Sequence, residues 1–456
     1  MNKPIQIIAL LASSWSWNTA LASPEADDVL ALAVDTGNWL ASQAIPQDAG
    51  VAWPADALQS KDASLNLGSG TAGVVVYLLG LHRATGEDRF LQLAEAGADY
   101  LVSLVRRPGL LQTGSRRASL YTGLAGIGVA LSRLAEVNAD YSAPANEVVL
   151  LLDDWSIAEG SGLRWSDEFN DLLYGDAGTV LFLADYAWRT RDTRAQELAV
   201  AGARRLAARG RTATAGRYWL FRRSKDFNLP GFSHGTSGIA YVLATVGELA
   251  SDEILRQAAS DGFDYIRSIA EVDGDIIRIP YGWPAENWKG LYEFGWAHGL
   301  AGTKALLARL QQLGIQEPEA ARLDALIVNT LSNIELPGPP AVPFAEPSTP
   351  LDWRFGRASV LSILSDSSDS IKTRDATWEA IAEAAIRDSD TAYWLVDAPE
   401  FMGGGEAAFT GVLHGSAGIG LALLRLHASL VGARPYITLP DDPMAWISRT
   451  SSAGKP

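Results

Sequence analysis

Seven stretches of this chain repeat one pattern, in which a Gly-x-x-Gly pair, or a decayed copy of it, opens a helix that is apolar nearly all round. The copies begin at Gly70, Gly123, Gly175, Gly235, Gly299, Gly356 (the decayed copy) and Gly415. The steps between them are 53, 52, 60, 64, 57 and 59 residues. A helix that is apolar on every side is buried. The spacing therefore predicts one supersecondary unit repeated along the whole chain.

A second, more polar helix follows these buried helices, and a further one precedes the first Gly pair. Residues 25–44, 252–269, 317–334 and 374–388 have this amphipathic pattern. Because an amphipathic helix buries only one face, we expect these helices to surround the apolar ones. The two sets predict an all-α fold, an α/α toroid of seven helical hairpins, formed by a single domain over residues 23–456.

The Gly pairs have a structural interpretation of their own. Without a Cβ, glycine lets the start of one helix approach its neighbour closely. The free N–H groups of the first turn would then point toward the centre of the ring. We interpret the pairs as packing and look for function in the residues beside them.

Histidine occupies one recurring slot beside the pairs. Three of the five histidines, His234, His298 and His414, directly precede the first glycine of a copy. In a closed toroid this slot faces the central pit, where an imidazole acts as an acid, a base or a ligand-binding group. The alternative is that these histidines only bond to neighbouring loops. We expect no metal on them, because Phe355 lies between two of the repeats that carry them.

Aromatic residues precede most of the Gly pairs, and the chain contains 15 tryptophans. Trp165, Trp283 and Trp296 are candidates for substrate binding, since aromatic rings at the rim of a pit stack on sugars or on peptide side chains. The alternative is that such rings cap the helix ends. The sequence leaves both interpretations open.

Carboxylates gather near the third repeat, and Glu168, Asp171 and Asp176 are the candidates among them. Paired carboxylates on an α/α barrel suggest glycoside hydrolysis, in which one is the acid and the other the base or nucleophile. The alternative is a solvated acidic surface.

The charge and composition exclude several classes of protein. The formal net charge is −16, from 53 acidic and 37 basic residues, which argues against a nucleic-acid partner. The chain has no cysteine, so it has neither disulfides nor thiolate ligands. No stretch after the N-terminal segment has 18 uninterrupted apolar residues, so we predict no membrane span.

The N-terminus predicts export. Lys3 precedes a mostly apolar stretch, and Ala20-Leu21-Ala22 forms an A-x-A cleavage site before Ser23. Residues 1–22 are therefore predicted to be a signal peptide, and the mature protein to be periplasmic or secreted. The alternative is a frayed start to the first helix.

Three stretches have a more specific character: DLLYGDAG at 171–178, SHGTSGI at 233–239 and WAHGLAG at 296–302. Together with the seven-fold repeat, they resemble the lanthionine synthetase C-like family. The resemblance implies an α/α toroid that cyclises peptides by adding a cysteine thiol across a dehydrated serine or threonine. It also implies that His234 is an acid or base and that Asp171 belongs to the same site.

The resemblance does not extend to the ligands of the family's metal site. The family holds one zinc with two cysteines and a histidine, and the corresponding positions here are Ala297, Arg354 and Phe355. An alignment that makes His414 the metal histidine is disfavoured, because Gly415 is the seventh copy. We expect no cofactor and no zinc-dependent thioether formation, with Arg354 as a fixed cation near the lost metal.

The family also has an arginine shortly before its first zinc cysteine, where this chain has residues 292–295 (YEFG). The leading hypothesis is an exported, monomeric protein that binds or modifies a peptide, with His234, Asp171, His298 and His414 as its polar centre. The alternatives are a carbohydrate-active enzyme with a small glycan ligand, and a scaffold without catalytic activity.

Overall fold

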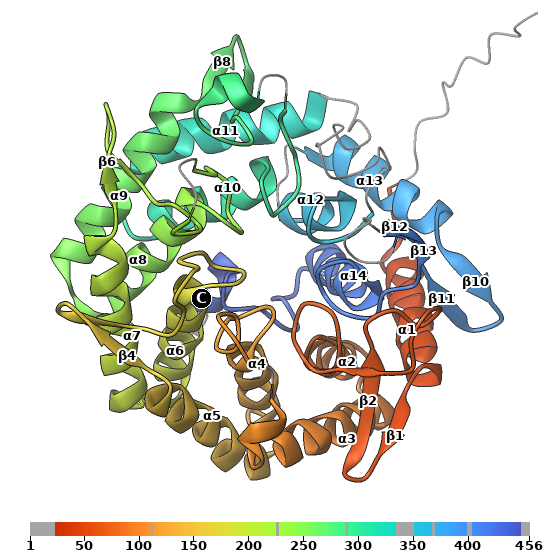
Figure 1. Ribbon diagram of the computed structural model, residues 1–456. Helices are drawn as coiled ribbons and strands as arrows, with labels where there is room; N and C mark the ends of the chain where they lie inside the picture. Colours follow the sequence, from red (N-terminus) through yellow and green to blue (C-terminus); the bar gives the residue numbers. More distant parts are fainter. Residues whose placement is uncertain are drawn as a thin grey trace, which may run out of the picture.

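Apolar and amphipathic helices alternate along the chain and form two concentric rings (Figure 1). The computed structural model describes residues 23–111, 113–224, 228–288, 291–333, 351–366, 370–398 and 404–447. The predicted signal peptide lies outside these residues. Within them, every helix is too short or too polar to cross a bilayer.

The inner ring consists, in the described part of the chain, of seven helices that each follow a Gly-x-x-Gly copy. They are α2 (Thr71–Thr85), α4 (Leu124–Leu134), α6 (Asp176–Thr190), α8 (Thr236–Ala250), α10 (Leu300–Gln312), α12 (Arg357–Leu364) and α14 (Ser416–Leu430). The outer ring consists of α1 (Ala26–Ser42), α3 (Asp88–Val105), α5 (Ser142–Asp154), α7 (Thr193–Ala208), α9 (Glu253–Ile269), α11 (Glu317–Asn333) and α13 (Ile371–Glu383).

The first and last helices close the ring. Each inner helix packs against the next, and α14 packs against α2. The outer partner of α14 is α1, so the seventh hairpin joins the two ends of the described chain (Figure 1). The predicted α/α toroid of seven hairpins is confirmed.

Short antiparallel strands, which the sequence pattern did not predict, connect outer helices to the next inner helix. They are β1 (Ile45–Gln47), β2 (Gly50–Pro54) and β3 (Ala63–Ser64), then β4 (Ile157–Glu159) with β5 (Gly162–Arg164), β6 (Arg211–Thr212) with β7 (Arg217–Tyr218), β8 (Glu271–Asp273) with β9 (Ile276–Arg278), β10 (Ile386–Asp388) with β11 (Thr391–Tyr393), and β12 (Val396–Ala398) with β13 (Gly405–Ala407). All of these strands except the five-residue β2 have two or three residues, which is too short for an alternating pattern to show.

Four tryptophans at the ends of these hairpins cap the outer helices. The indole N–H of each donates to a backbone carbonyl 13 residues earlier: Trp53 to Leu40, Trp165 to Leu152, Trp219 to Leu206 and Trp394 to Ile381. All four rings are buried. The expectation that Trp165 lines an exposed rim is therefore wrong, because its ring and its only polar atom are used inside the hairpin.

The second glycine of the motif is required by a close approach of backbone. A Cβ added at Gly238 would overlap the carbonyl oxygen of Phe232, in the loop just before the helix. The same overlap recurs at the other intact copies. In the decayed copy Ser359 takes this place, and its hydroxyl donates to the carbonyl of Gly356 and accepts from the N–H of Trp296.

The loops that precede the inner helices are joined to one another by backbone hydrogen bonds. The residue two positions before the first glycine donates its N–H to the carbonyl of the equivalent residue in another repeat. In the described residues these bonds run from Gly68 to Tyr121, Leu173 to Ser233, Ser233 to Ala297, Ala297 to Arg354, Arg354 to Leu413 and Leu413 to Gly68, at 2.8–3.1 Å. This ring of bonds holds the neighbouring side chains in register around the centre.

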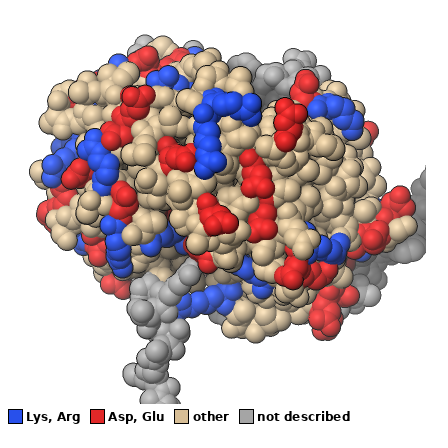
Figure 2. Space-filling model, turned by 90° about the horizontal axis from the view of Figure 1, so that it is seen from below, with Lys and Arg blue, Asp and Glu red and all other residues tan. Residues whose placement is uncertain are grey.

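The segment after α14 crosses the ring and packs on its inner helices. Arg133 donates to the carbonyl of Thr438, and Tyr241 donates to that of Pro440. Asp441 is buried and accepts from Tyr121 and Trp296. On the face viewed in Figure 2, acidic and basic side chains are interspersed.

Candidate functional site

Two slots of the inner loops bring polar side chains to the centre of the ring. One lies directly before the first glycine and holds His234, His298 and His414. The other lies four residues before that glycine and holds Asp171 in the third repeat and Asp352 in the sixth. Because the loops are in register, an acid of one repeat meets a histidine of the next.

Two Asp–His pairs result. His234 bonds through Nδ1 to the carboxyl of Asp171. His414 bonds through Nδ1 to Asp352, at 2.7 Å. All four side chains are buried. Asp352 was not predicted from the sequence, although it lies four residues before its glycine, as Asp171 does.

Arg354 joins the two pairs. Its Nη2 lies 3.2 Å from Nε2 of His234, and its Nη1 lies 3.4 Å from Nε2 of His414. The guanidinium is buried and lies over the ring of Phe355, 4.6 Å from the centroid. A single cation thus lies between two histidines that are each backed by an aspartate.

The guanidinium fixes the tautomer of both histidines. It has five N–H donors and no acceptor, so each Nε2 that it contacts must accept. The ring proton is then on Nδ1, which donates to the aspartate. Both partner carboxyls therefore serve as acceptors.

Burial shifts the ionisation of the first pair toward neutral forms. It lowers the pKa of His234 well below its ordinary value, and the charges of Arg354 and Arg116 lower it further. It also raises the pKa of Asp171, which the N–H of Tyr174 and the charges of Arg116 and Arg354 oppose. His234 is thus an unprotonated base at neutral pH.

His298 lacks the aspartate that its two counterparts have. The equivalent position in the preceding repeat is Gly231, where an added Cβ would lie 2.6 Å from the Cα of His298. Its Nε2 lies 3.3 Å from the Tyr281 hydroxyl, and its Nδ1 has no hydrogen-bond partner in the described residues. Burial lowers the pKa of His298, and repulsion from a protonated His234 and from Arg354 lowers it further.

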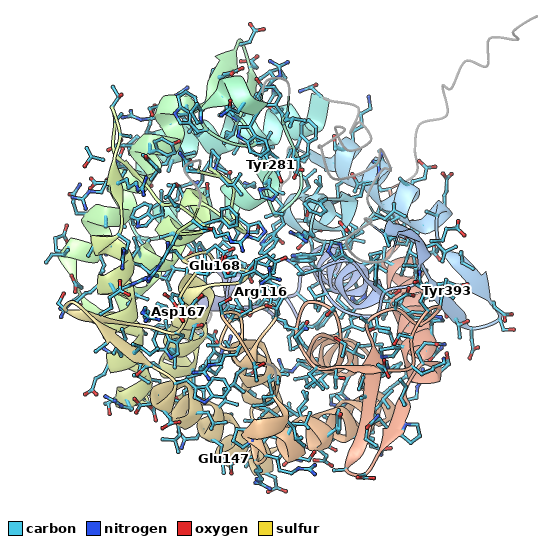
Figure 3. All side chains as sticks on the ribbon, viewed as in Figure 1. Arg116, Glu147, Asp167, Glu168, Tyr281 and Tyr393 are labelled. Atoms are coloured by element: carbon cyan, nitrogen blue, oxygen red, sulfur yellow. The ribbon has the colours of Figure 1, made fainter. Side chains whose placement is uncertain are left out.

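Two further ionisable groups adjoin this cluster. Glu293 lies in the stretch where the resemblance implies an arginine. Its side chain is buried, and burial raises its pKa to about 8. Arg116 is exposed and lies over the ring of Tyr174, 3.9 Å from its centroid. Figure 3 shows Arg116 and Glu168 toward the centre of the ring and Glu147 at its periphery.

The other predicted site residues have structural partners. Asp176 is buried, bonds to Arg205 and accepts from the N–H groups of Trp165 and Ser166. The prediction that Asp176 meets a substrate is therefore wrong, because its carboxylate is enclosed by its own repeat. Glu168 pairs with Arg222.

The two remaining tryptophan candidates differ in exposure. Trp296 is buried and donates to Asp441 at 3.1 Å, so it does not offer a surface for stacking. Trp283 is 37% exposed. Of the predicted substrate-binding tryptophans, Trp283 alone remains accessible to a ligand.

The residues at the centre do not fit the zinc that the family resemblance implies. Ala297 and Phe355 have no metal-binding atom, and the guanidinium of Arg354 occupies the Nε2 atoms of His234 and His414. In the described residues, no group of three or more His, Cys, Asp or Glu side chains is placed to hold a metal ion.

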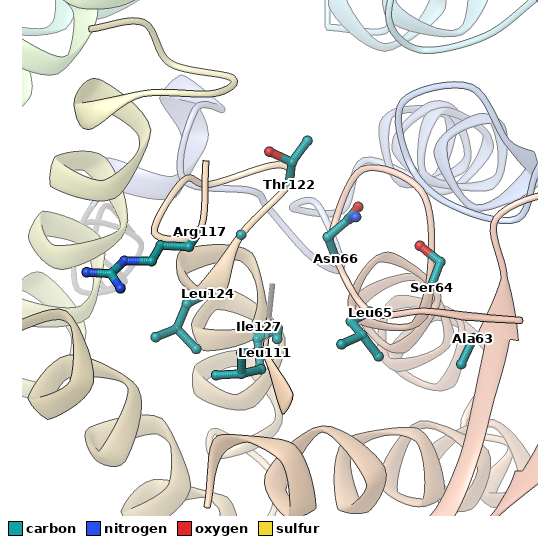
Figure 4. Close-up of a pocket in the computed structure, with 10 residues that line it drawn as sticks. Ala63, Ser64, Leu65, Asn66, Leu111, Arg117, Thr122, Leu124 and Ile127 are labelled. Carbon is teal, nitrogen blue, oxygen red and sulfur yellow. The ribbon is translucent and has the colours of Figure 1, made fainter. Parts of the chain in front are cut away.

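A pocket of about 230 Å³ lies beside the centre, between the loops that precede α2 and α4 (Figure 4). Its lining residues are Ala63, Ser64, Leu65, Asn66, Leu111, Arg117, Thr122, Gly123, Leu124 and Ile127. Asn66 and Thr122 occupy the two slots that hold Asp171 and His234 in the later repeats. These two slots therefore offer an amide and a hydroxyl group beside the pocket, where the later repeats offer a carboxyl and an imidazole.

Comparison with known proteins identifies a family and similar folds. A family model described as lanthionine synthetase C-like protein matches residues 61–336. The solved structure of nisin cyclase matches with a TM-score of 0.59 and 16% identity, over 92% of this chain and 96% of that chain. No curated protein sequence matches.

More distant structures include two that act on sugars. Cellobiose 2-epimerase from Bacillus thermoamylovorans B4167 matches with a TM-score of 0.46 and 10% identity, over 88% of this chain and 98% of that chain. The alpha-1,6-mannanase GH76A of Salegentibacter sp. HEL1_6 matches with a TM-score of 0.42 and 12% identity, over 79% of this chain and 99% of that chain. At this distance neither structure bears on function.

Proposed function

Since this chain belongs to the lanthionine synthetase C-like family, we propose that it binds a peptide at the centre of its ring and acts on it by proton transfer, without zinc. The signal-peptide pattern of residues 1–22 supports placing this activity in the exported space. The mature protein acts there as a monomer.

One observation carries the proposal: Arg354 bonds to Nε2 of both His234 and His414. Its position corresponds to a zinc cysteine of the family. A guanidinium there supplies a fixed positive charge, but it cannot bind a thiolate as a metal does or accept a proton. The two Asp–His pairs remain, so base chemistry is retained while metal activation of a thiol is not.

His234 is the base in this proposal. A peptide N–H or O–H group replaces Arg354 at Nε2 and transfers its proton there. Asp171 accepts the Nδ1–H throughout and stabilises the imidazolium that forms. The peptide group becomes an anion, and the displaced guanidinium stabilises its charge.

The carbohydrate alternative has weaker support. It requires two carboxylates free to act as acid and base. Glu168 is paired with Arg222, and Asp171 is bonded to His234. Of the three predicted stacking tryptophans, Trp165 and Trp296 are buried and Trp283 alone is exposed.

Selection from a random peptide library tests the proposal. The wild-type protein should enrich peptides whose affinity falls about tenfold or more in His234→Gln and in Arg354→Met, since each removes a buried polar contact. His82→Gln, in the last turn of α2, is the matched control and should bind like wild type. Failure to enrich any peptide, or equal binding by all variants, contradicts the proposal.

Mass spectrometry of protein exported by cells tests the location. The mature N-terminus should be Ser23. A full-length chain retained in the cytoplasm contradicts export without affecting the peptide-binding proposal.

A further inference from the structure

Three polar atoms at the centre have no hydrogen-bond partner in the described residues. They are Nε of Arg354, Nδ1 of His298 and Oε2 of Glu293. The three residues are only 8%, 3% and 7% exposed. Burying a polar group without a partner costs about 1–3 kcal/mol, and more when it is charged. Three such groups in one cluster therefore indicate that a group from outside the described residues completes it.

The cluster is continuous around one aromatic ring. The ring of Phe355 is stacked on His298, with centroids 6.2 Å apart, and Arg354 lies over it. His298 is also 5.3 Å from His234, centroid to centroid. The charge of Arg354 acts on both Glu293 and His298. A ligand at Arg354 would therefore lie beside the other two groups.

The described residues at the equivalent acidic positions do not supply the missing partner of His298. Asp171 and Asp352 serve His234 and His414, and the corresponding residue for His298 is Gly231. Any side chain at position 231 would collide with the Cα of His298. An acceptor for His298 must therefore come from elsewhere.

All three atoms can donate a hydrogen bond at neutral pH. The Arg354 Nε–H can only donate. When Tyr281 donates its hydroxyl to Nε2 of His298, the proton of that neutral ring is on Nδ1. Burial raises the pKa of Glu293 to about 8, with Asp352 adding to the effect and Arg354 opposing it, so this carboxyl is protonated below that pH.

We propose that the centre binds a carboxylate, whose oxygens accept from Arg354 Nε–H, His298 Nδ1–H and the Glu293 carboxyl. The ligand carboxylate plays the part for His298 that Asp171 plays for His234. This inference deepens the proposed function, because it makes a peptide C-terminus or an acidic side chain the recognised group. The cluster already holds Asp171 and Asp352 beside Arg354 and Arg116, so a monoanion fits it better than a phosphate dianion.

Acetate titration of the full chain labelled with ¹⁵N-histidine tests the inference. With only five histidines, each imidazole gives a resolved signal. Acetate should cause saturable shifts at His298, while His82 stays unchanged, and chloride at equal ionic strength should have no such effect. In Arg354→Met the acetate affinity should fall about tenfold or more, because a charge-assisted hydrogen bond is lost.

Glu293→Gln provides a second test, which leaves the charge of Arg354 in place. In the wild type, acetate affinity should fall as the pH rises from 7 to 9, because Glu293 ionises and then repels the anion. Asp352, Arg354 and Tyr281 face this carboxyl and are unchanged by the substitution. Glutamine stays a donor, so the affinity of this variant should no longer fall over that range.

The outcomes separate this inference from the proposed function. Absence of a saturable acetate shift, or tighter binding of inorganic phosphate than of acetate, overturns the carboxylate inference and leaves peptide selection unaffected. If acetate binds as described and no peptide is enriched, the proposed function fails and the carboxylate site remains.

Discussion

The guanidinium of Arg354 contacts Nε2 of His234 at 3.2 Å, although the two residues are 120 positions apart in the chain. This contact places a permanent cation on the face of the imidazole that a base would use. It fixes the proton on Nδ1, toward Asp171, and it lowers the pKa of the ring. The ionisation of His234 is therefore a direct measure of where Arg354 lies.

Replacing Arg354 with methionine should raise the pKa of His234. The cation that opposes protonation is removed, whereas burial, the larger cause, remains. Arg354→Lys keeps the charge and should shift this pKa less. Titration of the ¹⁵N-histidine signals measures both changes, and an unchanged His234 pKa in the methionine variant would show that the contact is absent in solution.

The stability of the protein should fall in weak acid, in part through His234. Its folded-state pKa is below the ordinary 6.5, so below about pH 6.5 the unfolded chain binds a proton that the folded chain does not. Each such histidine costs about 1.4 kcal/mol of unfolding free energy per pH unit below that point. The raised pKa values of Asp176 and Asp441, both about 6, act in the opposite direction.

His234→Gln isolates this contribution, because glutamine does not titrate. Between pH 6.5 and 5.5 the variant should lose about 1 kcal/mol less stability than the wild type, measured by urea unfolding at both pH values. Equal losses in the two proteins would mean that His234 is protonated in the folded state.

Trp219→Phe should destabilise the protein by about 1–3 kcal/mol, because it removes the indole donor to the Leu206 carbonyl and leaves that carbonyl unpaired. Trp283→Phe, at a ring that is 37% exposed, is the matched control and should change stability little. Denaturant unfolding compares the two. A larger loss at Trp283 than at Trp219 would refute the capping role.

Gly238→Ala should cost about 3 kcal/mol or more, because its Cβ overlaps the Phe232 carbonyl oxygen and the backbone must move. Gly109→Ala is the control, since its added Cβ meets nothing within 4 Å. Thermal or urea unfolding distinguishes them. Similar stability in both variants would show that the motif tolerates a side chain at this position.

The repeat could be predicted from the sequence because each unit contains its own buried helix and its own glycines. That is why the helix near 252–269 was found at Glu253–Ile269 and the one near 317–334 at Glu317–Asn333. The histidine slot could be located for the same reason. The pairing of His234 with Asp171 then follows from the register of adjacent loops.

Contacts between side chains of distant repeats could not be predicted from the sequence in this way. Asp352 could have been found by applying the four-residue offset of Asp171 to every repeat. The position of Arg354 between two histidines depends on where distant loops meet, and a local pattern contains no such information. The capping role of the tryptophans could not be predicted, because their acceptors are backbone carbonyls, which every residue has.

Elemental analysis of the full chain purified without chelators most directly tests the proposal that a guanidinium has replaced the metal. Zinc should be far below one ion per chain, while Ala297→Cys/Arg354→Cys/Phe355→His, which restores the family's three ligands, should gain bound zinc. One tightly bound zinc per wild-type chain would contradict the claim.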